Sequence, residues 1–255
     1  MEMTAYTEFF STYETAQWVL LALTALLVGM SKTGIQGVTL LVIPLMALSF
    51  GAKPSTGLIL PLLCMADIFA VLHYRRVADW TFIVRLLPSA VAGFFVALAV
   101  DHFVPASEFK KLMGACLLFV LILMMLTERK GKRNMLIDKW WYGPLFGLLG
   151  GFTTMIGNAA GPVMAIYLLS TKMPKLNFVG TNAWFFMVVN LLKVPLQIFA
   201  WHNITLQTFA ADLCCLPAIF LGGVLGLRLV KWLPEKAFRR FITVVTWISV
   251  ILMLL

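Results

Sequence analysis

Residues 29–44 read GMSKTGIQGVTLLVIP, an apolar stretch that contains a lysine, hydroxyl and amide side chains and two closely spaced glycines. Apolar runs flank its polar part on both sides, at residues 18–30 and 38–50. Each run is shorter than the ~20 residues that a helix needs to cross a bilayer. A polar break at membrane depth is tolerated where it faces protein or a water-filled cavity. The pattern therefore predicts two half-helices that meet at residues 31–37.

The second half-helix would begin in the interior of the membrane, where its N-terminus would be available to a ligand. The first N–H groups of a helix have no partner within the helix, and they carry a partial positive charge. Anions therefore bind readily at helix N-termini. Residues 31–37 thus predict an anion-binding site at membrane depth.

The composition is that of a polytopic helical membrane protein. Hydrophobic residues make up 61% of the 255 residues and charged residues only 12%, and the mean hydropathy is +0.94. The apolar runs lack the period-2 alternation of a transmembrane β-barrel. The net charge of +9 comes from short basic clusters between apolar runs, as in cytoplasmic loops, so nucleic acid is not an expected partner. Without a nucleophile–base set, a nucleotide-binding loop or metal-ligand spacing, we expect neither an enzyme nor a cofactor.

The two halves of the chain match each other in sequence. A polar segment at residues 128–139, ERKGKRNMLIDK, separates them, so we predict a repeat at residues 1–127, a linker, and a second repeat at residues 140–255. The second repeat opens with its own polar break, TTMIGNAAGP at residues 153–162. A change of offset indicates a six-residue insertion near Trp201. Matched positions are Ser31 with Thr154, Gly34 with Gly157 and Asp67 with Asn190 at an offset of 123 residues, and Pro88 with Pro217 and Gly93 with Gly222 at an offset of 129.

Each repeat is expected to contain about five membrane elements, and an odd number would place the second repeat upside down relative to the first. If the acidic N-terminus lies outside, most lysines and arginines fall inside, and only Lys53, Lys110 and Lys111 fall outside. This distribution follows the positive-inside rule. We therefore predict a multi-pass protein of the inner (cytoplasmic) membrane with both termini outside. Whether each broken pair crosses twice or re-enters stays open, because the charge count is the same.

Inverted repeats that each contain a broken helix place the substrate site near the midplane, where the two breaks meet. Hydroxyl and amide donors there suit an oxyanion that must bind and then leave. Alternatively, the hydroxyls only cap helices and the glycines only let helices pack closely. Lys32 either supplies charge to the anion or extends to the cytoplasmic mouth. The predicted substrate-binding residues are Ser31, Lys32, Thr33, Gly34, Gln36, Gly37, Thr154, Gly157, Asn158 and Asn182.

Asp67 and Lys193 lie deep within expected membrane helices. Ionisable residues inside a membrane are costly, which makes them functional candidates. Asn190 lies three residues before Lys193, on the same helical face. Asp67 can pair with Lys32 or Lys193 and fix the two repeats together, or it can carry a proton. We therefore predict that Asp67, Asn190 and Lys193 form a coupling site or an ion pair.

Both breaks resemble those of a known family. They read SKTGIQGVTLLVIPL at residues 31–45 and IGNAAGPVMAIYLL at residues 156–169. With its two inverted halves, the chain resembles the TauE/SafE sulfite exporter family over nearly its whole length. The resemblance implies transport of a small sulfur-containing anion such as sulfite, thiosulfate or an organosulfonate.

The sequence thus predicts an all-α membrane transporter that exports sulfite or a similar anion by alternating access, within a lipid bilayer, as a monomer or a homo-oligomer. Moving one charge across 100 mV is worth about 2.3 kcal/mol, so an outgoing anion needs no coupling ion. The alternative is proton- or cation-coupled uptake of thiosulfate or an organosulfonate, for which Asp67 would be the carboxylate. A channel and a structural membrane protein are the remaining hypotheses.

Overall fold

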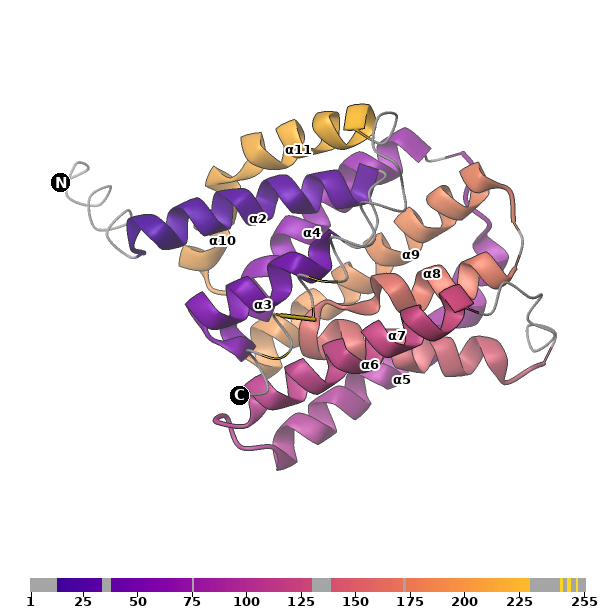
Figure 1. Cartoon of the computed structure of the whole chain (residues 1–255), viewed down its shortest axis with the longest axis horizontal. Helices are drawn as coiled ribbons and strands as arrows, with labels where there is room; N and C mark the ends of the chain where they lie inside the picture. The colour runs from indigo at the N-terminus through magenta and orange to yellow at the C-terminus, as the bar shows by residue number, and fades with distance from the viewer. Residues whose placement is uncertain are drawn as a thin grey trace.

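The computed structural model describes residues 13–33, 38–74, 76–129, 139–171 and 173–229, together with four single positions nearer the C-terminus. Within these ranges the fold is entirely helical, as predicted, with ten α-helices, one π-helical turn and no strand. Most of the helices run along the long axis of the molecule (Figure 1).

Four of the described helices are long and apolar enough to span a membrane, and a bent helix pair is a fifth candidate. The first half contains α2 (Thr15–Thr33), α3 (Thr39–Phe50), α4 (Ala52–Tyr74), α5 (Trp80–Phe103) and α6 (Phe109–Arg129). The second half contains α7 (Tyr142–Gly157), α8 (Ala160–Ser170), α9 (Lys175–Pro195), the π-helical turn η1 (Leu196–Ala200), α10 (Leu206–Cys214) and α11 (Leu216–Leu229).

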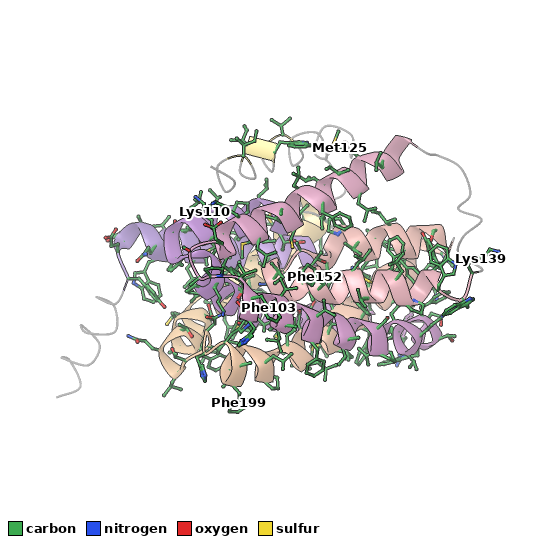
Figure 2. All side chains as sticks on the ribbon, turned by 90° about the horizontal axis from the view of Figure 1, so that it is seen from below. Phe103, Lys110, Met125, Lys139, Phe152 and Phe199 are labelled. Carbon is green, nitrogen blue, oxygen red and sulfur yellow. The ribbon has the colours of Figure 1, made fainter. Side chains whose placement is uncertain are left out.

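Large apolar side chains cover the outside of the bundle, as expected of a surface in contact with lipid. Phe103 is 82% exposed and Phe199 is 74% exposed. Phe199 lies at the lower edge of the molecule in Figure 2, in which Lys110 and Lys139 lie toward opposite ends. Composition, helix length and an apolar surface therefore all identify the chain as a multi-pass membrane protein.

The expected breaks occur between α2 and α3 and between α7 and α8, but the sequence pattern placed the start of each break too early. The prediction that the run before the first break is too short to cross a membrane was wrong, because α2 has 19 residues and is one of the candidate spans. α2 continues through Ser31, Lys32 and Thr33, and α7 continues through Thr154 to Gly157. Hydroxyl side chains can bond to the preceding turn without ending a helix. Thr33 Oγ1 donates to the carbonyl of Gly29 at 3.1 Å, and Thr153 Oγ1 donates to that of Leu149 at 2.7 Å.

Asn158 ends α7 by adopting a left-handed conformation, with φ of 55°. Asparagine tolerates this region better than most residues, which makes it a common helix terminator. Its N–H donates to the carbonyl of Thr154 at 2.9 Å, and the N–H of Ala159 donates to that of Thr153 at 3.2 Å. Only Asn158 and Ala159 separate α7 from α8.

The broken helix pair of each half packs against a helix of the other half. α2 lies against α11, and α7 lies against α5. Glycines permit the close approach of the backbones. A Cβ atom at Gly222 would lie 1.9 Å from the carbonyl oxygen of Leu26, and one at Gly151 would lie 2.0 Å from that of Ala90. The two halves of the chain therefore interlock.

Two smaller expectations had different outcomes. Asp79 directly precedes the apolar run at residues 80–100, which predicts an N-cap, and its Oδ1 accepts from the N–H of Thr81 at 3.0 Å, which confirms the cap. The apolar run from Leu206 to Val230 predicts a single helix, and this prediction is wrong. α10 and α11 meet at Cys215 with a bend of 47°. Pro217 lacks an N–H group and its ring clashes with the preceding turn, which interrupts a helix.

Two ends of the bundle can be defined by contacts between segments that are distant in the sequence. At the Lys53 end, Lys53 pairs with Asp101 at 2.7 Å, and Asn203 Nδ2 donates to the carbonyl of Lys53 at 3.0 Å. At the Asp79 end, the N–H of Asp79 donates to Thr181 Oγ1 at 2.8 Å. α4 and α9 run between the two ends in opposite directions.

Candidate functional site

A cavity of about 70 Å³ lies between α2, α3, α4, α7, α8 and α9. A water molecule in the liquid takes up about 30 Å³, so the cavity has room for a few waters or one small anion. Its apolar wall includes Phe186 of α9 and Leu63 of α4. Its polar wall consists of Ser31, Lys32, Thr39, Thr154, Asn158, Asn182 and Asn190.

Six of these residues belong to the groups predicted from the sequence, and the structure brings them together from three helices and a break. The remaining predicted residues lie elsewhere or are not described. Thr33 lines a second, mostly apolar cavity of about 210 Å³ between α2, α4 and α11. Gly157 does not line the substrate cavity, and a Cβ there would lie 3.3 Å from Met113. Gly34, Gln36 and Gly37 lie outside the described residues.

Lys32 and Asp67 form an ion pair beside the cavity, with 2.7 Å between Nζ and Oδ1. The Asp67 side chain is fully buried, and its Oδ2 accepts from Asn190 Nδ2 at 2.7 Å. The Lys32 ammonium also lies over the ring of Phe186, 4.5 Å from its centre. Lys32 therefore points into the bundle toward the Asp67 carboxylate. Of the two partners considered for Asp67, Lys32 and Lys193, the structure shows the ion pair with Lys32.

Lys193 is fully buried and binds three oxygens. Its Nζ donates to the carbonyl of Thr154 at 2.9 Å, to Thr154 Oγ1 at 2.9 Å and to Asn158 Oδ1 at 2.6 Å. These oxygens lie in the last turn of α7 and just after it. The carbonyls at a helix C-terminus lack intrahelical partners and carry partial negative charge, so they suit an ammonium group.

The three charged groups leave the site with one excess positive charge. The charges of Lys32 and Asp67 offset each other, whereas Lys193 has no carboxylate within 4.0 Å in the described part of the chain. An uncompensated charge is costly to keep out of water. A small anion in the cavity would compensate it.

Both second half-helices begin at the cavity. Thr39 is the first residue of α3 and Gly161 is the second residue of α8, and both line the cavity wall. Pro162 follows within the first turn of α8, where proline is tolerated because the first N–H groups need no partner. The positive ends of two helices therefore border the same space.

The amide groups of the wall differ in which of their atoms are already hydrogen-bonded. Asn158 accepts from Lys193 and donates through Nδ2 to the carbonyl of Thr56 at 3.1 Å, so its oxygen is already engaged. The Oδ1 atoms of Asn182 and Asn190 have no hydrogen-bond partner among the described residues. Sequence reasoning missed Thr39, although it is the first polar residue after the Gly34–Gly37 segment.

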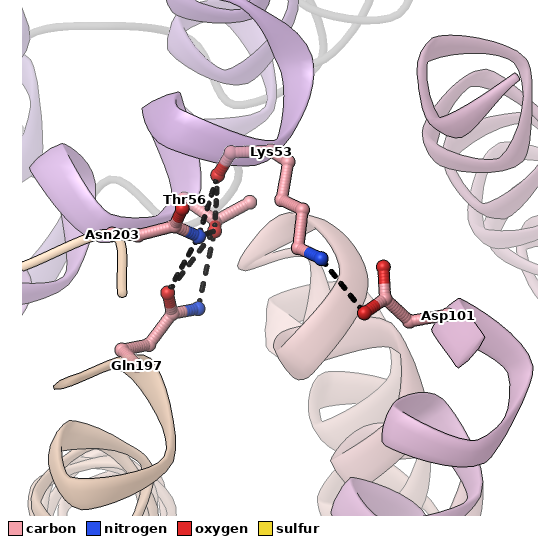
Figure 3. A network of polar contacts seen from close by, with 5 residues as sticks. All are labelled: Lys53, Thr56, Asp101, Gln197 and Asn203. Carbon is pink, nitrogen blue, oxygen red and sulfur yellow. Dashed lines mark hydrogen bonds and ion pairs between the residues drawn. The ribbon is translucent and has the colours of Figure 1, made fainter. Parts of the chain in front are cut away.

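Beyond Asn158, toward the Lys53 end, lie three polar side chains, here called the amide cluster: Thr56, Gln197 and Asn203. Thr56 Oγ1 accepts from Gln197 Nε2 at 3.1 Å and donates to the carbonyl of Lys53 at 2.7 Å. Asn203 Nδ2 donates to Gln197 Oε1 at 3.0 Å. Figure 3 shows the cluster beside the Lys53–Asp101 ion pair. The sequence analysis did not identify any member of the cluster.

The π-helical turn η1 contributes Gln197 to the amide cluster. Its register is set by the N–H of Trp201, which donates to the carbonyl of Leu196 at 3.1 Å. Gln197 is the buried residue of this turn, 1% exposed. Single π-helical turns within longer helices occur frequently at functional sites.

The amide and lysine side chains of α9 and η1 differ in burial. Asn182 is half-buried near the Asp79 end, Asn190 is 1% exposed, and Lys193 and Gln197 are 0% and 1% exposed. The residues of α9 that line the cavity lie between Val179 and Asn190. The part of α9 that lines the cavity therefore lies nearer the Asp79 end than Lys193 and Gln197 do.

Comparison with known proteins gives one match. The family model described as Sulfite exporter TauE/SafE matches residues 21–253, a range that contains every residue of the cavity wall. No curated protein and no solved structure matches the chain.

Proposed function

The chain belongs to the TauE/SafE sulfite exporter family, and we propose that it exports sulfite or a similar small sulfur-containing anion across the inner membrane by alternating access. The family is one of membrane transporters of sulfite and related anions. The observation that carries the proposal is the small cavity at the two helix breaks, which is lined by Lys32 and by neutral hydroxyl and amide groups. Asp67 and Lys193 lie behind its wall, bonded to Lys32 and to Asn158.

The size and chemistry of the cavity support a small oxyanion as substrate. About 70 Å³ suits an ion of four or five heavy atoms and excludes a drug-sized ligand, for which pockets of about 300–1,000 Å³ are usual. Ser31 and Thr39 offer hydroxyl donors, and Lys32 offers an ammonium group. Hydrogen bonds from such donors to a charged acceptor contribute about 1.5–3 kcal/mol each, which is strong enough to hold an anion and weak enough to release it.

Two contacts support the proposed inverted repeat. Asp67 and Asn190 occupy matching positions in the two halves, and they are hydrogen-bonded to each other. Ser31 and Thr154 also match, and both line the cavity. Equivalent residues of a pseudo-symmetric pair can touch only near the axis that relates them. A substrate site on this axis is typical of transporters built from inverted repeats.

Export is the favoured direction for electrical reasons. With the cytoplasm negative, one negative charge that leaves across 100 mV gains about 2.3 kcal/mol. We propose that the Asp79 end faces the cytoplasm and that the Lys53 end faces outside, as the distribution of basic residues favours. The cavity would then receive its anion from the cytoplasm, and the amide cluster would have to separate for release.

Coupled uptake is the second candidate, and one observation favours it. Asp212 of α10 is fully buried, and neither of its carboxylate oxygens has a hydrogen-bond partner among the described residues. A carboxyl group inside a membrane with no cation beside it suits a proton carrier. Asp67 is less suited to that role, because Lys32 and Asn190 already occupy its oxygens.

Transport in liposomes tests the direction and the coupling together. Purified protein should release entrapped sulfite when a potassium gradient with valinomycin makes the lumen negative, with equal pH on both sides. Lys193→Met should abolish this release, and Lys111→Met, which removes an exposed lysine, should not. Release that requires a pH gradient at constant voltage, and that Asp212→Asn abolishes, would replace export with coupled transport.

Orientation needs a separate measurement in whole cells. Single cysteines in place of Glu14 and Lys139, both exposed, should react differently with a membrane-impermeant thiol reagent. We expect the cysteine at position 14 to be labelled from outside and the cysteine at position 139 to be protected. The reverse pattern would invert the proposed topology.

A further inference from the structure

We infer that the cavity selects its substrate by valence and takes a singly charged oxyanion, such as hydrogensulfite or an alkanesulfonate, in preference to a dianion. This inference rests on the proposed function, because it assigns the class of anion that the same site holds. It follows from the number of charges around the cavity and from the groups that hold them.

Lys193 is held as a cation by its surroundings. An ammonium group has three N–H donors, and Lys193 Nζ has three oxygen atoms within 2.9 Å. Nζ is the donor in all three contacts, which uses the three N–H groups of an ammonium, whereas a neutral amine has only two. The last turn of α7 adds the partial negative charge of a helix C-terminus.

Lys32 and Asp67 contribute no net charge. Their closest atoms are 2.7 Å apart, and the second carboxylate oxygen accepts from Asn190. The remaining polar residues of the wall, Ser31, Thr39 and Asn182 among them, are neutral. One positive charge therefore remains for the substrate to balance.

Two opposing terms decide between a monoanion and a dianion. Doubling the charge of the ion doubles its attraction to one excess positive charge. The cost of removing an ion from water rises with the square of its charge, so it increases fourfold. Because Phe186, Leu63 and Val179 form part of the wall, water cannot fully solvate the second charge. A monoanion leaves the site neutral, whereas a dianion leaves one uncompensated negative charge.

Methanesulfonate and thiosulfate form a matched pair of probes for this inference. Both are tetrahedral at sulfur, both have five heavy atoms, and both keep a fixed charge around neutral pH. They differ by one unit of charge. Isothermal titration of the purified full-length protein in detergent, at equal ionic strength, should give a lower Kd for methanesulfonate than for thiosulfate.

Asp67→Asn should reverse this preference. The variant retains the shape of the side chain and an oxygen for Asn190, and it leaves two positive charges at the site. The ratio of thiosulfate to methanesulfonate affinity should rise by about tenfold or more, because removing a nearby negative charge strengthens the attraction of a dianion more than that of a monoanion. Lys193→Gln should change the ratio in the opposite direction, and it provides a second reading if Asp67→Asn does not fold.

Glu108→Gln is the matched control. It removes one carboxylate from the exposed Lys111–Glu108 pair, and the affinity ratio should stay at the wild-type value. Tighter binding of thiosulfate by the wild-type protein, or an unchanged ratio in Asp67→Asn and in Lys193→Gln, would overturn valence selection and leave anion transport intact. Failure of sulfite and both probes to bind the wild-type protein would overturn the proposed function as well.

Discussion

The cavity and the amide cluster are neighbouring regions of the molecule, but their polar groups are organised in opposite ways. The cavity is lined by Lys32, which pairs with Asp67 behind the wall, and the Oδ1 atoms of Asn182 and Asn190 have no partner in the described structure. The amide cluster is neutral, and Thr56, Gln197 and Asn203 satisfy one another. Asn158 joins the two regions through the carbonyl of Thr56.

This difference shows how a membrane protein can be polar in two ways. A neutral network whose members are all paired offers nothing to a ligand, so it can close a path without binding the substrate. A charged site with unpaired atoms is costly until something occupies it. The comparison predicts large effects from changes in cavity charge and small effects from changes in the amide cluster.

The largest expected effect is on stability and comes from Lys32→Met. The substitution leaves the Asp67 carboxylate buried without its ammonium partner, and breaking a buried ion pair in this way costs about 3–5 kcal/mol. The unfolding transition in detergent should fall accordingly. The double variant Lys32→Met/Asp67→Asn should recover much of the loss. If the single variant is as stable as the wild type, the Lys32–Asp67 ion pair does not stabilise the fold.

Lys193→Met should have the next largest effect, on anion affinity. Removing one partner of a buried charged contact costs about 2–5 kcal/mol, which corresponds to at least about thirtyfold in Kd. Sulfite titration and the melting temperature should be measured on the same preparation, so that weak binding can be separated from unfolding. Lys111→Met should bind sulfite as the wild type does. Unchanged affinity in Lys193→Met would remove the excess positive charge from the mechanism.

Asn182→Ala should lower sulfite affinity by a smaller amount. The amide lies on the cavity wall and can donate to a bound anion, and one hydrogen bond to a charged group contributes about 1.5–3 kcal/mol. The melting temperature should not change, because the Asn182 oxygen has no partner in the described structure. A lower melting temperature with normal affinity would show that Asn182 stabilises the fold and does not bind the anion.

The smallest expected change in affinity is for Gln197→Leu, within about threefold, because a neutral hydrogen bond contributes only about 1 kcal/mol. Its effect should instead be on closure. With a single cysteine in place of Ala183 in the cavity wall, an impermeant thiol reagent added outside should react faster in Gln197→Leu than in the parent.

Gln17→Leu is the matched control for closure, because Gln17 is an amide at the same end that bonds to the carbonyl of Ser49. It should leave the rate of labelling unchanged. Equal labelling in the parent and in Gln197→Leu would show that the amide cluster does not close the path.

The sequence was sufficient to predict the charged region but not the neutral one. Asp67, Lys193 and Lys32 are conspicuous because an ionisable residue in an apolar run is costly, and the repeat connected Asp67 with Asn190. Thr56, Gln197 and Asn203 carry no such signal. They come from a helix start, a π-helical turn and a loop, and only the folded chain brings them together.

The breaks show a second limit of sequence reasoning. Glycines and hydroxyl residues located the helix pairs, but α2 and α7 extend further than the pattern indicated because their hydroxyls bond to the preceding turn. Pro217 did provide a signal for the bend between α10 and α11. Its match with Pro88 obscured that signal, because α5 continues through Pro88 without a break.

The π-helical turn has a consequence for the balance between the two conformations of a carrier. It lies next to the six-residue insertion that the proposed repeat requires near Trp201, close to Asn203 of the amide cluster. The proposed symmetry would otherwise make the two states of the transporter nearly equal in free energy. Two or three extra hydrogen bonds at one end, each worth about 1 kcal/mol, would favour the state closed at that end by roughly thirtyfold or more. The most populated conformation of the empty carrier would then have its cavity open to the compartment that supplies the anion.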